Sequence, residues 1–162
     1  MSEREYLIGY GEDIHALEEG RPLVLGGIKI PHNKGCIAHS DGDVVLHALS
    51  DAILGALNLR DIGYHFKVDD PKWDNASSLL ILAEVNKMMK DKGYEINNID
   101  ISISAEKPHL NAYIPDMQEA INKVLNCGPE YISIKAMTNE KMDSVGQELA
   151  IRVSAIVMLK RV

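Results

Sequence analysis

The sequence predicts a single-domain α+β protein in which a mixed β-sheet is covered on one face by helices. Two kinds of segment indicate this class: stretches in which apolar and polar residues alternate, as in strands, and stretches with apolar residues at helical intervals. No internal repeat or linker divides the chain, so residues 1–162 are expected to form one domain. With 46% hydrophobic residues, that domain is large enough to bury a core.

The first expected strand covers residues 6–15 and carries Asp13 and His15 near its end. Side chains two positions apart in an extended chain point to the same face, so these two are expected to lie together. Alone, such a pair is usually a strand that runs into a polar turn. A hairpin is expected over residues 23–30, because a Gly-Gly pair that tolerates positive φ separates two apolar triplets.

The first expected helix covers residues 41–57, where apolar residues recur at helical intervals. Ser40 is a natural N-cap for it. Asp41 and Asp43 then fall in the first turn, where the helix dipole favours negative charge.

Two further helices are expected, over residues 76–92 with Gly93 as C-cap, and over residues 111–128. Pro115 must fall in the first turn of the last helix or precede it. The alternating segment 95–108 between them is predicted to be a strand.

The C-terminal part of the chain is less clearly patterned. Residues 131–138 are predicted to be a strand, and residues 143–146 a turn. The segment 147–161 fits a helix or a strand, and its β-branched residues favour a strand for the final part.

Composition narrows the class of function. The chain has 24 acidic and 17 basic residues, a formal charge of −7, which does not favour nucleic acid as a partner. Cys36 and Cys127 have no metal-type spacing and suggest no disulfide framework, which fits a reducing compartment. No apolar run approaches the roughly 18 residues needed to span a membrane, and the N-terminus does not resemble a secretory signal.

A polar stripe on the first helix is the first sign of a functional site. Asp43, His47 and Asp51 are spaced at i, i+4 and i+8 and therefore share one helix face. Such stripes are usually solvated, but histidine is unusual in them. Together with Asp13 and His15 they suit a divalent metal such as zinc, which takes nitrogen and oxygen ligands. The spacing alone leaves a metal site and a solvated surface both open.

Four segments together resemble a known family. They are "GYGEDIHAL", "IPHNKGCIAHSDGDVVLHALSDAILGAL", "LRDIGYHF" and "IKAMTNEKMDSVG". In order and spacing they are similar to the 2-C-methyl-D-erythritol 2,4-cyclodiphosphate synthase family, from about residue 7 to the C-terminus. The resemblance implies a homotrimer with a central cavity and with active sites between neighbouring subunits.

The resemblance also implies a reaction and two metals. The expected enzyme is a zinc-dependent phosphorus–oxygen lyase of the non-mevalonate isoprenoid pathway. It cyclises 4-diphosphocytidyl-2-C-methyl-D-erythritol 2-phosphate to 2-C-methyl-D-erythritol 2,4-cyclodiphosphate and releases CMP. Asp13, His15 and His47 match the zinc ligands, and the fourth zinc position is then open to a phosphate oxygen. Glu140 matches a residue that helps to hold a second cation, Mg²⁺ or Mn²⁺, and counts with Thr138 among the catalytic residues.

Further positions match residues that contact the substrate. His39 and Ser40 match a loop at the phosphate and diol, Asp61 and Gly63 match positions that bind the sugar hydroxyls, and Thr138 matches a donor to the diphosphate. The segment Ala105–Leu110, with Pro108 and His109, matches the cytosine pocket. Asp43 and Asp51 are expected to orient an imidazole N–H rather than to bind metal.

The chain departs from the family pattern at three places. Lys67 and Val68 stand where a Pro-Asp pair is usual, which puts the ordering of substrate there in doubt. His109 stands where a lysine often follows the proline, so a positive contact near the nucleotide is weaker. Gln147 stands where many bacterial members carry an arginine associated with isoprenoid diphosphates in the central cavity. Binding of such a diphosphate is therefore expected to be weak or altered.

Two other functions remain compatible with the sequence. One is a different metal-assisted phosphoryl transfer on a nucleotide-linked substrate, with water as the nucleophile. The other is a trimeric nucleotide- or isoprenoid-binding protein whose zinc is structural. The expected location is the cytoplasm in a bacterium, or a plastid or apicoplast if the chain is a processed eukaryotic protein.

Overall fold

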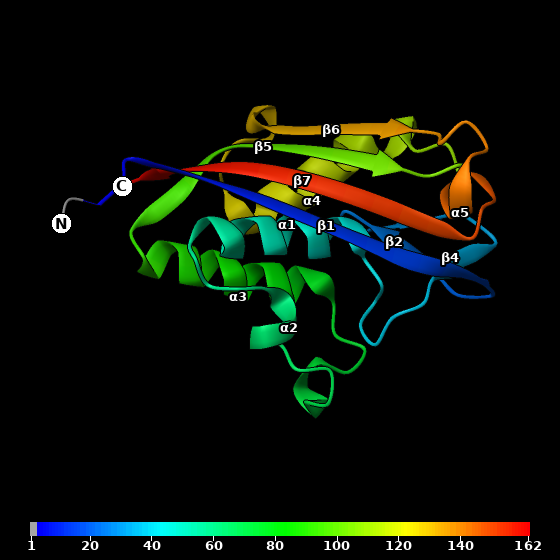
Figure 1. Cartoon of the computed structure of the whole chain (residues 1–162), viewed down its shortest axis with the longest axis horizontal. Coiled ribbons are helices and arrows are strands. Elements are labelled where there is room, and N and C mark those ends of the chain that lie inside the picture. Colours follow the sequence, from blue (N-terminus) through cyan, green and yellow to red (C-terminus); the bar gives the residue numbers. More distant parts are fainter. Residues whose placement is uncertain (1–2) are drawn as a thin grey trace.

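A five-stranded sheet organises the structure, a computed structural model that describes residues 3–162 (Figure 1). Its strands lie in the order β4-β1-β7-β5-β6, and β2 and β3 form a separate hairpin. The strands are β1 (Tyr6–Glu19), β2 (Leu23–Leu25), β3 (Ile28–Ile30), β4 (Lys34–Cys36), β5 (Tyr94–Ser104), β6 (Ile132–Met137) and β7 (Ala150–Arg161). The helices are α1 (Val44–Ala56), α2 (Ile62–His65), α3 (Ser78–Asp91), α4 (Ile114–Leu125) and α5 (Asp143–Gly146), with 3-10 turns at Pro71–Trp73, Asn111–Tyr113 and Pro129–Tyr131.

The sheet is mixed, as the sequence predicted. Strands β5 and β6 pair in parallel, whereas β1 with β4, β1 with β7 and β5 with β7 are antiparallel. The β1–β7 ladder is long and extends from Tyr6 opposite Lys160 to Ala16 opposite Ala150. It therefore holds the middle of β1 rigidly beside the centre of the sheet.

The helices cover one face of this sheet. Helix α1 packs on β1 and β7, α4 contacts β6, and α3 packs against both α1 and α4 (Figure 1). Burial alternates along β7 accordingly: Val153, Ala155 and Val157 are buried, and Ile156 between them is exposed. The prediction of an α+β domain with helices on one face of a mixed sheet is confirmed.

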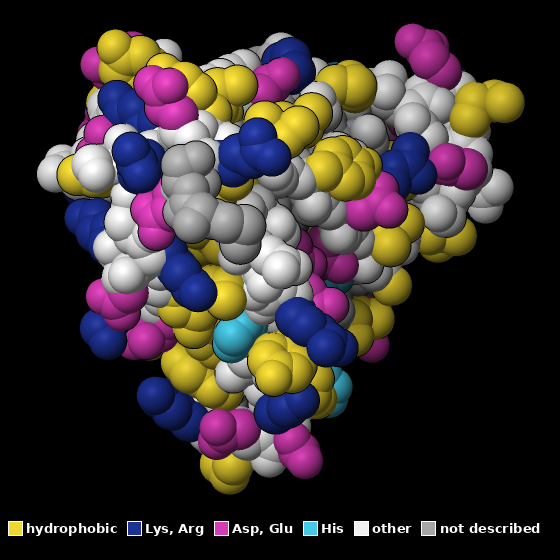
Figure 2. All heavy atoms as spheres, turned by 60° about the vertical axis from the view of Figure 1, so that its left-hand side comes forward, with side chains coloured by type: hydrophobic (Ala, Val, Ile, Leu, Met, Phe, Trp, Pro, Cys, Tyr) yellow, Lys and Arg dark blue, Asp and Glu magenta, His cyan; other side chains and the backbone are white. Residues whose placement is uncertain are grey.

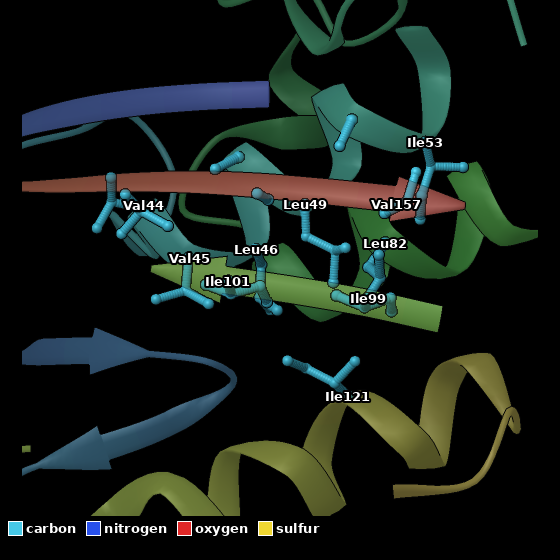
Figure 3. Packing of buried hydrophobic residues seen from close by; sticks show 14 of the residues in the cluster. Val44, Val45, Leu46, Leu49, Ile53, Leu82, Ile99, Ile101, Ile121 and Val157 are labelled. Atoms are coloured by element: carbon cyan, nitrogen blue, oxygen red, sulfur yellow. The ribbon is translucent and has the colours of Figure 1, made fainter. Parts of the chain in front are cut away.

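The core lies between the sheet and the helices. Figure 3 shows side chains of α1, including Leu46, Leu49 and Ile53, beside Ile101 of β5 and Leu82 of α3. These side chains are almost completely shielded from solvent. Burial of such aliphatic groups, at roughly 25 cal/mol per Å² of apolar surface, fixes α1 over the strands and with it every side chain that α1 carries.

Strand β1 approaches α1 more closely than side chains would allow. A Cβ atom added at Gly11 would lie 2.1 Å from the carbonyl oxygen of Ala48, and one at Gly9 would lie 1.9 Å from that of Ala52. Glycine at these two positions lets strand and helix touch backbone to backbone. The two elements that carry the predicted metal ligands are therefore held against each other.

Two predicted boundaries near the site were wrong. Strand β1 continues to Glu19, so Asp13 and His15 lie in mid-strand, because pairing with β7 and then β4 continues past them. Helix α1 starts at Val44 rather than residue 41, and Asp43, not Ser40, is its N-cap, since its carboxylate accepts a hydrogen bond from the Leu46 amide. Gly42, with a φ of +76°, keeps the preceding residues out of the helix.

The other elements agree closely with the predictions. The hairpin β2–β3 is present, α3 begins two residues late and is followed by Gly93 at positive φ, and Pro115 lies in the first turn of α4. The C-terminal segment is a strand, β7. Strand β5 ends at Ser104, before residue 108, and the predicted turn at 143–146 is the short helix α5.

The surface in Figure 2 carries acidic and basic side chains interspersed with hydrophobic ones. This face offers no continuous basic field among the residues that the structure describes, and such a field is what phosphate backbones need. Within residues 3–162, no helix has the length and apolar character required to cross a bilayer. Cys36 and Cys127 are both free, and burial raises the pKa of the Cys36 thiol to about 12.

Candidate metal centre and adjoining pockets

Asp13, His15 and His47 converge on one point between β1 and α1. One ligating atom from each lies within 4.8 Å of the other two. The Asp13 carboxylate oxygen Oδ2 is 2.7 Å from His15 Nε2 and 3.3 Å from His47 Nδ1. Residues 32 positions apart are thus joined because the Gly11 contact sets α1 directly against β1.

Electrostatics at this point favour a cation. Burial by itself raises the pKa of Asp13, but hydrogen bonds with His15 and His47 outweigh it and lower the pKa to about 2. Burial lowers the pKa of His47, but the hydrogen bond with Asp13 and the charges of Asp43 and Asp13 outweigh it and raise that pKa. The cluster is therefore an ionised carboxylate beside two imidazoles in an acidic setting, a donor set that suits zinc.

Within the described chain, neither Asp43 nor Asp51 hydrogen-bonds an imidazole, contrary to prediction. Asp43 is fully buried and accepts hydrogen bonds from the amides of Gly26, Gly27 and Leu46, so it ties the hairpin turn to the start of α1. Burial raises the pKa of Asp43 to about 6, against those three hydrogen bonds. Asp51 accepts the Ile62 amide at 2.8 Å. Each carboxylate accepts hydrogen bonds from the backbone instead, and a sequence pattern does not reveal these long-range contacts.

Partners for the imidazoles come from elsewhere. His47 Nε2 lies 2.9 Å from the hydroxyl of Ser78 and 3.2 Å from that of Ser40. The second ring nitrogen of His15, Nδ1, is buried and has no hydrogen-bond partner among the described residues.

A cavity of about 290 Å³ adjoins the metal cluster. His15 and His47 line it, together with three of the predicted substrate-binding residues, His39, Ser40 and Gly63. Arg21 donates to the carbonyls of Cys36 and Ala38 and so holds the loop that carries His39 and Ser40. The rest of the lining is apolar apart from Lys67; the apolar residues are Ile37, Ala38, Ile62, Phe66, Val68, Trp73 and Ile81.

Asp61 is outside the lining of this cavity. It is the N-cap of α2, and its carboxylate accepts the Tyr64 amide at 3.0 Å. The hydrogen bond from Ile62 to Asp51 fixes the same segment to α1. Asp61 and Gly63 are therefore positioned relative to His47 through α1, although only Gly63 faces the cavity. His65 Nε2 lies 2.6 Å from the Leu59 carbonyl oxygen.

A second, smaller cavity of about 150 Å³ lies where β5 and β6 end. Four residues of the predicted cytosine-pocket segment line it together with the predicted diphosphate donor Thr138, whereas Glu106 and Lys107 do not; the four are Ala105, Pro108, His109 and Leu110. The Ala105 amide donates to the Met137 carbonyl, which joins the two strand ends. This cavity shares no lining residue with the first within residues 3–162.

Glu140 lies in the loop after β6 and lines neither cavity of the described chain. Its φ is +52° and that of Lys141 is +61°, and the Glu140 amide approaches the Thr138 hydroxyl at 3.4 Å. Glu106 accepts the Asn139 amide at 3.0 Å, so the loop that bears Glu140 is tied to the edge of the second cavity.

The three departures from the family pattern lie in different places. Lys67 and Val68 line the first cavity, His109 lines the second, and Gln147 is exposed at the end of α5.

Sequence reasoning missed several contributors to the site. Ser78 and Asp41, which contact His47 or one another, and the aromatic side chains of Phe66 and Trp73 were not predicted. Ser78 lies 31 positions from His47, and a serine near a helix start ordinarily indicates a cap. The packing of α3 on α1 brings it to His47, and no local pattern signals that.

Comparison with known proteins places these features in a family. A sequence model described as the YgbB family matches residues 6–160. A relative from Acaryochloris marina, named 2-C-methyl-D-erythritol 2,4-cyclodiphosphate synthase, is 51% identical over 152 residues, 94% of this chain and 94% of the relative.

Solved structures of similar proteins have the same fold. One described as 2C-methyl-D-erythritol-2,4-cyclodiphosphate synthase in a CDP-bound form has a TM-score of 0.88 at 34% identity, covering 94% of this chain and 99% of the other. A CDP complex of IspF from Plasmodium falciparum has a TM-score of 0.86 at 36% identity, covering 99% of each chain.

Proposed function

The chain belongs to the YgbB family, and on that premise we propose that it is a cyclodiphosphate synthase of isoprenoid precursor biosynthesis. The substrate is 4-diphosphocytidyl-2-C-methyl-D-erythritol 2-phosphate. An oxygen of its 2-phosphate bonds to the β-phosphorus, and the bond from that phosphorus to the oxygen bridging the two phosphates breaks. The products are 2-C-methyl-D-erythritol 2,4-cyclodiphosphate and CMP. No water is consumed, so the enzyme is a phosphorus–oxygen lyase.

The observation that carries this proposal is the convergence of Asp13, His15 and His47 beside a cavity. Two imidazoles and one carboxylate are a donor set that zinc accepts, and three protein ligands leave one position open. We propose these three residues as the zinc ligands and Glu140 as a ligand of a second cation, Mg²⁺ or Mn²⁺. When bound, zinc supplies Lewis acidity that draws charge from the β-phosphate.

The substrate's two ends fit the two cavities. The loop of His39 and Ser40 and the backbone at Gly63 bind the erythritol end in the first cavity, with Asp61 presenting α2 to the sugar hydroxyls. The Ala105–Leu110 segment binds cytosine in the second, and Thr138 donates its hydroxyl to the diphosphate. These residues hold the 2-phosphate close to the β-phosphorus, which converts a flexible encounter into an oriented intramolecular step.

The separation of the cavities supports a shared active site. Within one chain the metal cluster lies on β1 and α1, whereas the second cavity lies on β5 and β6, with β7 between them. We propose a homotrimer with a central cavity in which the metal cluster of one subunit faces the cytosine pocket of its neighbour.

An uncovered apolar sheet face is available for this assembly. Tyr6, Ile8, Tyr10 and Ile14 of β1 are exposed on the face opposite the helices, and Tyr10 pairs with Ile156 of β7, which is 53% exposed. Contiguous apolar surface of this kind typically marks an interface. The proposed partners are therefore the small-molecule substrate and copies of this chain, with neither nucleic acid nor membrane. The proposed location is a bacterial cytoplasm, or a plastid or apicoplast.

Phosphorus NMR tests the proposed reaction. The zinc-loaded protein is incubated with the diphosphocytidyl substrate and Mg²⁺, and the expected result is loss of the substrate signals with appearance of CMP and a cyclic diphosphate. Appearance of an open-chain phosphate would indicate hydrolysis with water as the nucleophile. Bound nucleotide without turnover, in zinc-loaded trimeric protein, would indicate a binding protein; either outcome contradicts the proposal.

A further inference from the structure

Ser78 connects His47 to a carboxylate that no sequence pattern linked to the site. It is the first residue of α3 and is fully buried. Its hydroxyl oxygen lies 2.9 Å from His47 Nε2 and makes a short hydrogen bond, 2.5 Å, to Asp41 Oδ1. Asp41 also accepts the Ser78 amide at 2.9 Å and the Asp43 amide at 3.0 Å. Asp41 and Ser78 are therefore locked together behind the imidazole, on the side away from Asp13.

The direction of these hydrogen bonds follows from the number of protons. An ionised carboxylate only accepts, so the single hydroxyl proton of Ser78 points to Asp41. The hydroxyl oxygen can then only accept from His47, which requires a proton on Nε2. Nδ1, 3.3 Å from Asp13, donates its proton to that carboxylate in the metal-free chain and is the ring nitrogen that presents a lone pair once a metal takes the proton's place.

We propose that Asp41 and Ser78 are a positioning pair that fixes the tautomer and ring orientation of His47, so that Nδ1 is directed to the metal. This inference rests on the proposed zinc site and adds two residues to it. Metal-binding histidines commonly donate their second N–H to such a partner, which sets the tautomer and strengthens the ligand.

The neighbouring imidazole shows why the pair matters. The corresponding nitrogen of His15 is buried without a partner in the described part of the chain. The hydroxyl of Ser40 also approaches His47 Nε2, at 3.2 Å, but it lies in the half-buried loop that we assign to the substrate, and no carboxylate in the described part of the chain accepts its proton. Of the two imidazoles, only His47 therefore has its second ring nitrogen hydrogen-bonded to a fixed polar network within the described residues.

Zinc affinity and histidine NMR, both without substrate, test the proposal. Zinc dissociation constants are measured by chelator competition for the parent, Ser78→Ala and Asp41→Asn. The matched control is Ser50→Ala, because Ser50 is also a fully buried serine, lies on α1, and its hydroxyl has no partner among the described residues. Long-range ¹H–¹⁵N spectra of the zinc-loaded proteins report which nitrogen of His47 bears the proton and which the metal.

Ser78→Ala is expected to weaken zinc binding roughly 10- to 100-fold, the usual effect of removing such a partner, and to broaden the Nε2–H signal by faster exchange. Asp41→Asn is expected to weaken zinc binding too. Its NH₂ group would either face the Ser78 backbone N–H, donor against donor, or donate to the Ser78 hydroxyl, whose proton would then no longer point to residue 41. Ser50→Ala should bind zinc like the parent.

Three outcomes would overturn the proposal. The first is parent-like affinity in Ser78→Ala with the proton still fixed on Nε2. If Ser78→Ala does not fold, parent-like affinity in Asp41→Asn is the second. The third is a parent that carries zinc on Nε2. A parent that binds no zinc would instead contradict the proposed metal site itself, so the two failures are distinguishable.

Discussion

Replacing Gly11 by alanine tests whether the contact between β1 and α1 sets the metal site. The added Cβ would lie 2.1 Å from the Ala48 carbonyl oxygen and 2.7 Å from the Ala52 amide nitrogen, whereas ordinary contact begins at 3.4 Å. Both obstacles are helix backbone, so no side chain can rotate away. Helix and strand would have to separate by more than about 1 Å, while metal–ligand distances tolerate about 0.2 Å.

Two losses are therefore expected in Gly11→Ala. Overpacking of this kind costs about 1–3 kcal/mol of unfolding free energy, measured by urea denaturation of the metal-free protein. Zinc affinity, measured by chelator competition, should fall by at least about 10-fold, because His47 moves away from Asp13 and His15.

Gly55→Ala is the matched control. Gly55 lies on α1, on the other side of the contact with β1, but a Cβ there would meet only the Tyr10 carbonyl at 3.8 Å, so alanine fits and should raise stability by up to about 1 kcal/mol. Parent-like stability and zinc affinity in Gly11→Ala would refute the claim that this contact aligns the two halves of the site.

Asp43, Asp51, His47 and Gln147 each give a further expected outcome. Asp43→Ala should lower the unfolding free energy by at least about 2 kcal/mol in urea denaturation, because three backbone N–H groups lose their acceptor at a cost of roughly 1–3 kcal/mol each; a loss below about 0.5 kcal/mol would contradict that role. Burial raises the pKa of Asp51, although a hydrogen bond from Ile62 lowers it. The favourable contribution of this carboxyl to the unfolding free energy is therefore complete below its ordinary pKa of 3.8 and is lost as the pH rises through the raised value. The unfolding free energy of Asp51→Asn should therefore exceed that of the parent most near pH 7, and the difference should disappear toward pH 4. A difference that does not change with pH would argue against this role of Asp51. His47→Ala should stay folded and keep the oligomeric state of the parent by light scattering but lose zinc and turnover, whereas unfolding of metal-stripped parent would point to structural zinc. Because the family resemblance leads us to expect a basic residue where Gln147 stands, titration with an isoprenoid diphosphate should show weak binding, and tight binding would refute that expectation.

The sequence was sufficient for the elements, because these depend on short-range periodicity. The spacing of Asp13, His15 and His47 left a metal site and a solvated surface both open, and the proposal of zinc ligands rests on the family resemblance. Alternation and helical spacing identify the strands and helices that carry Asp13, His15 and His47. Their convergence, however, depends on Gly9 and Gly11 letting two backbones touch, which only the packed structure displays.

The sequence did not indicate which side chains form hydrogen bonds with residues that are distant along the chain. Asp43 looked like a candidate to orient an imidazole, yet its carboxylate is taken by the hairpin turn, 16 and 17 positions away. Ser78 looked like a residue of the α3 start, yet its hydroxyl lies against His47. In both cases the hydrogen-bond partner of a short polar side chain depends on how α1, α3 and the hairpin pack. The local spacing of residues does not indicate that packing.

The source of the oxygen atoms in the products distinguishes intramolecular attack by the 2-phosphate from attack by water. Zinc-loaded protein, Mg²⁺ and the diphosphocytidyl substrate are incubated in water enriched in ¹⁸O, and the masses of both products are measured. Intramolecular attack by the 2-phosphate predicts that CMP and the cyclic diphosphate both form and that neither carries ¹⁸O. One ¹⁸O atom in CMP or in a sugar phosphate would identify water as the nucleophile and contradict the account.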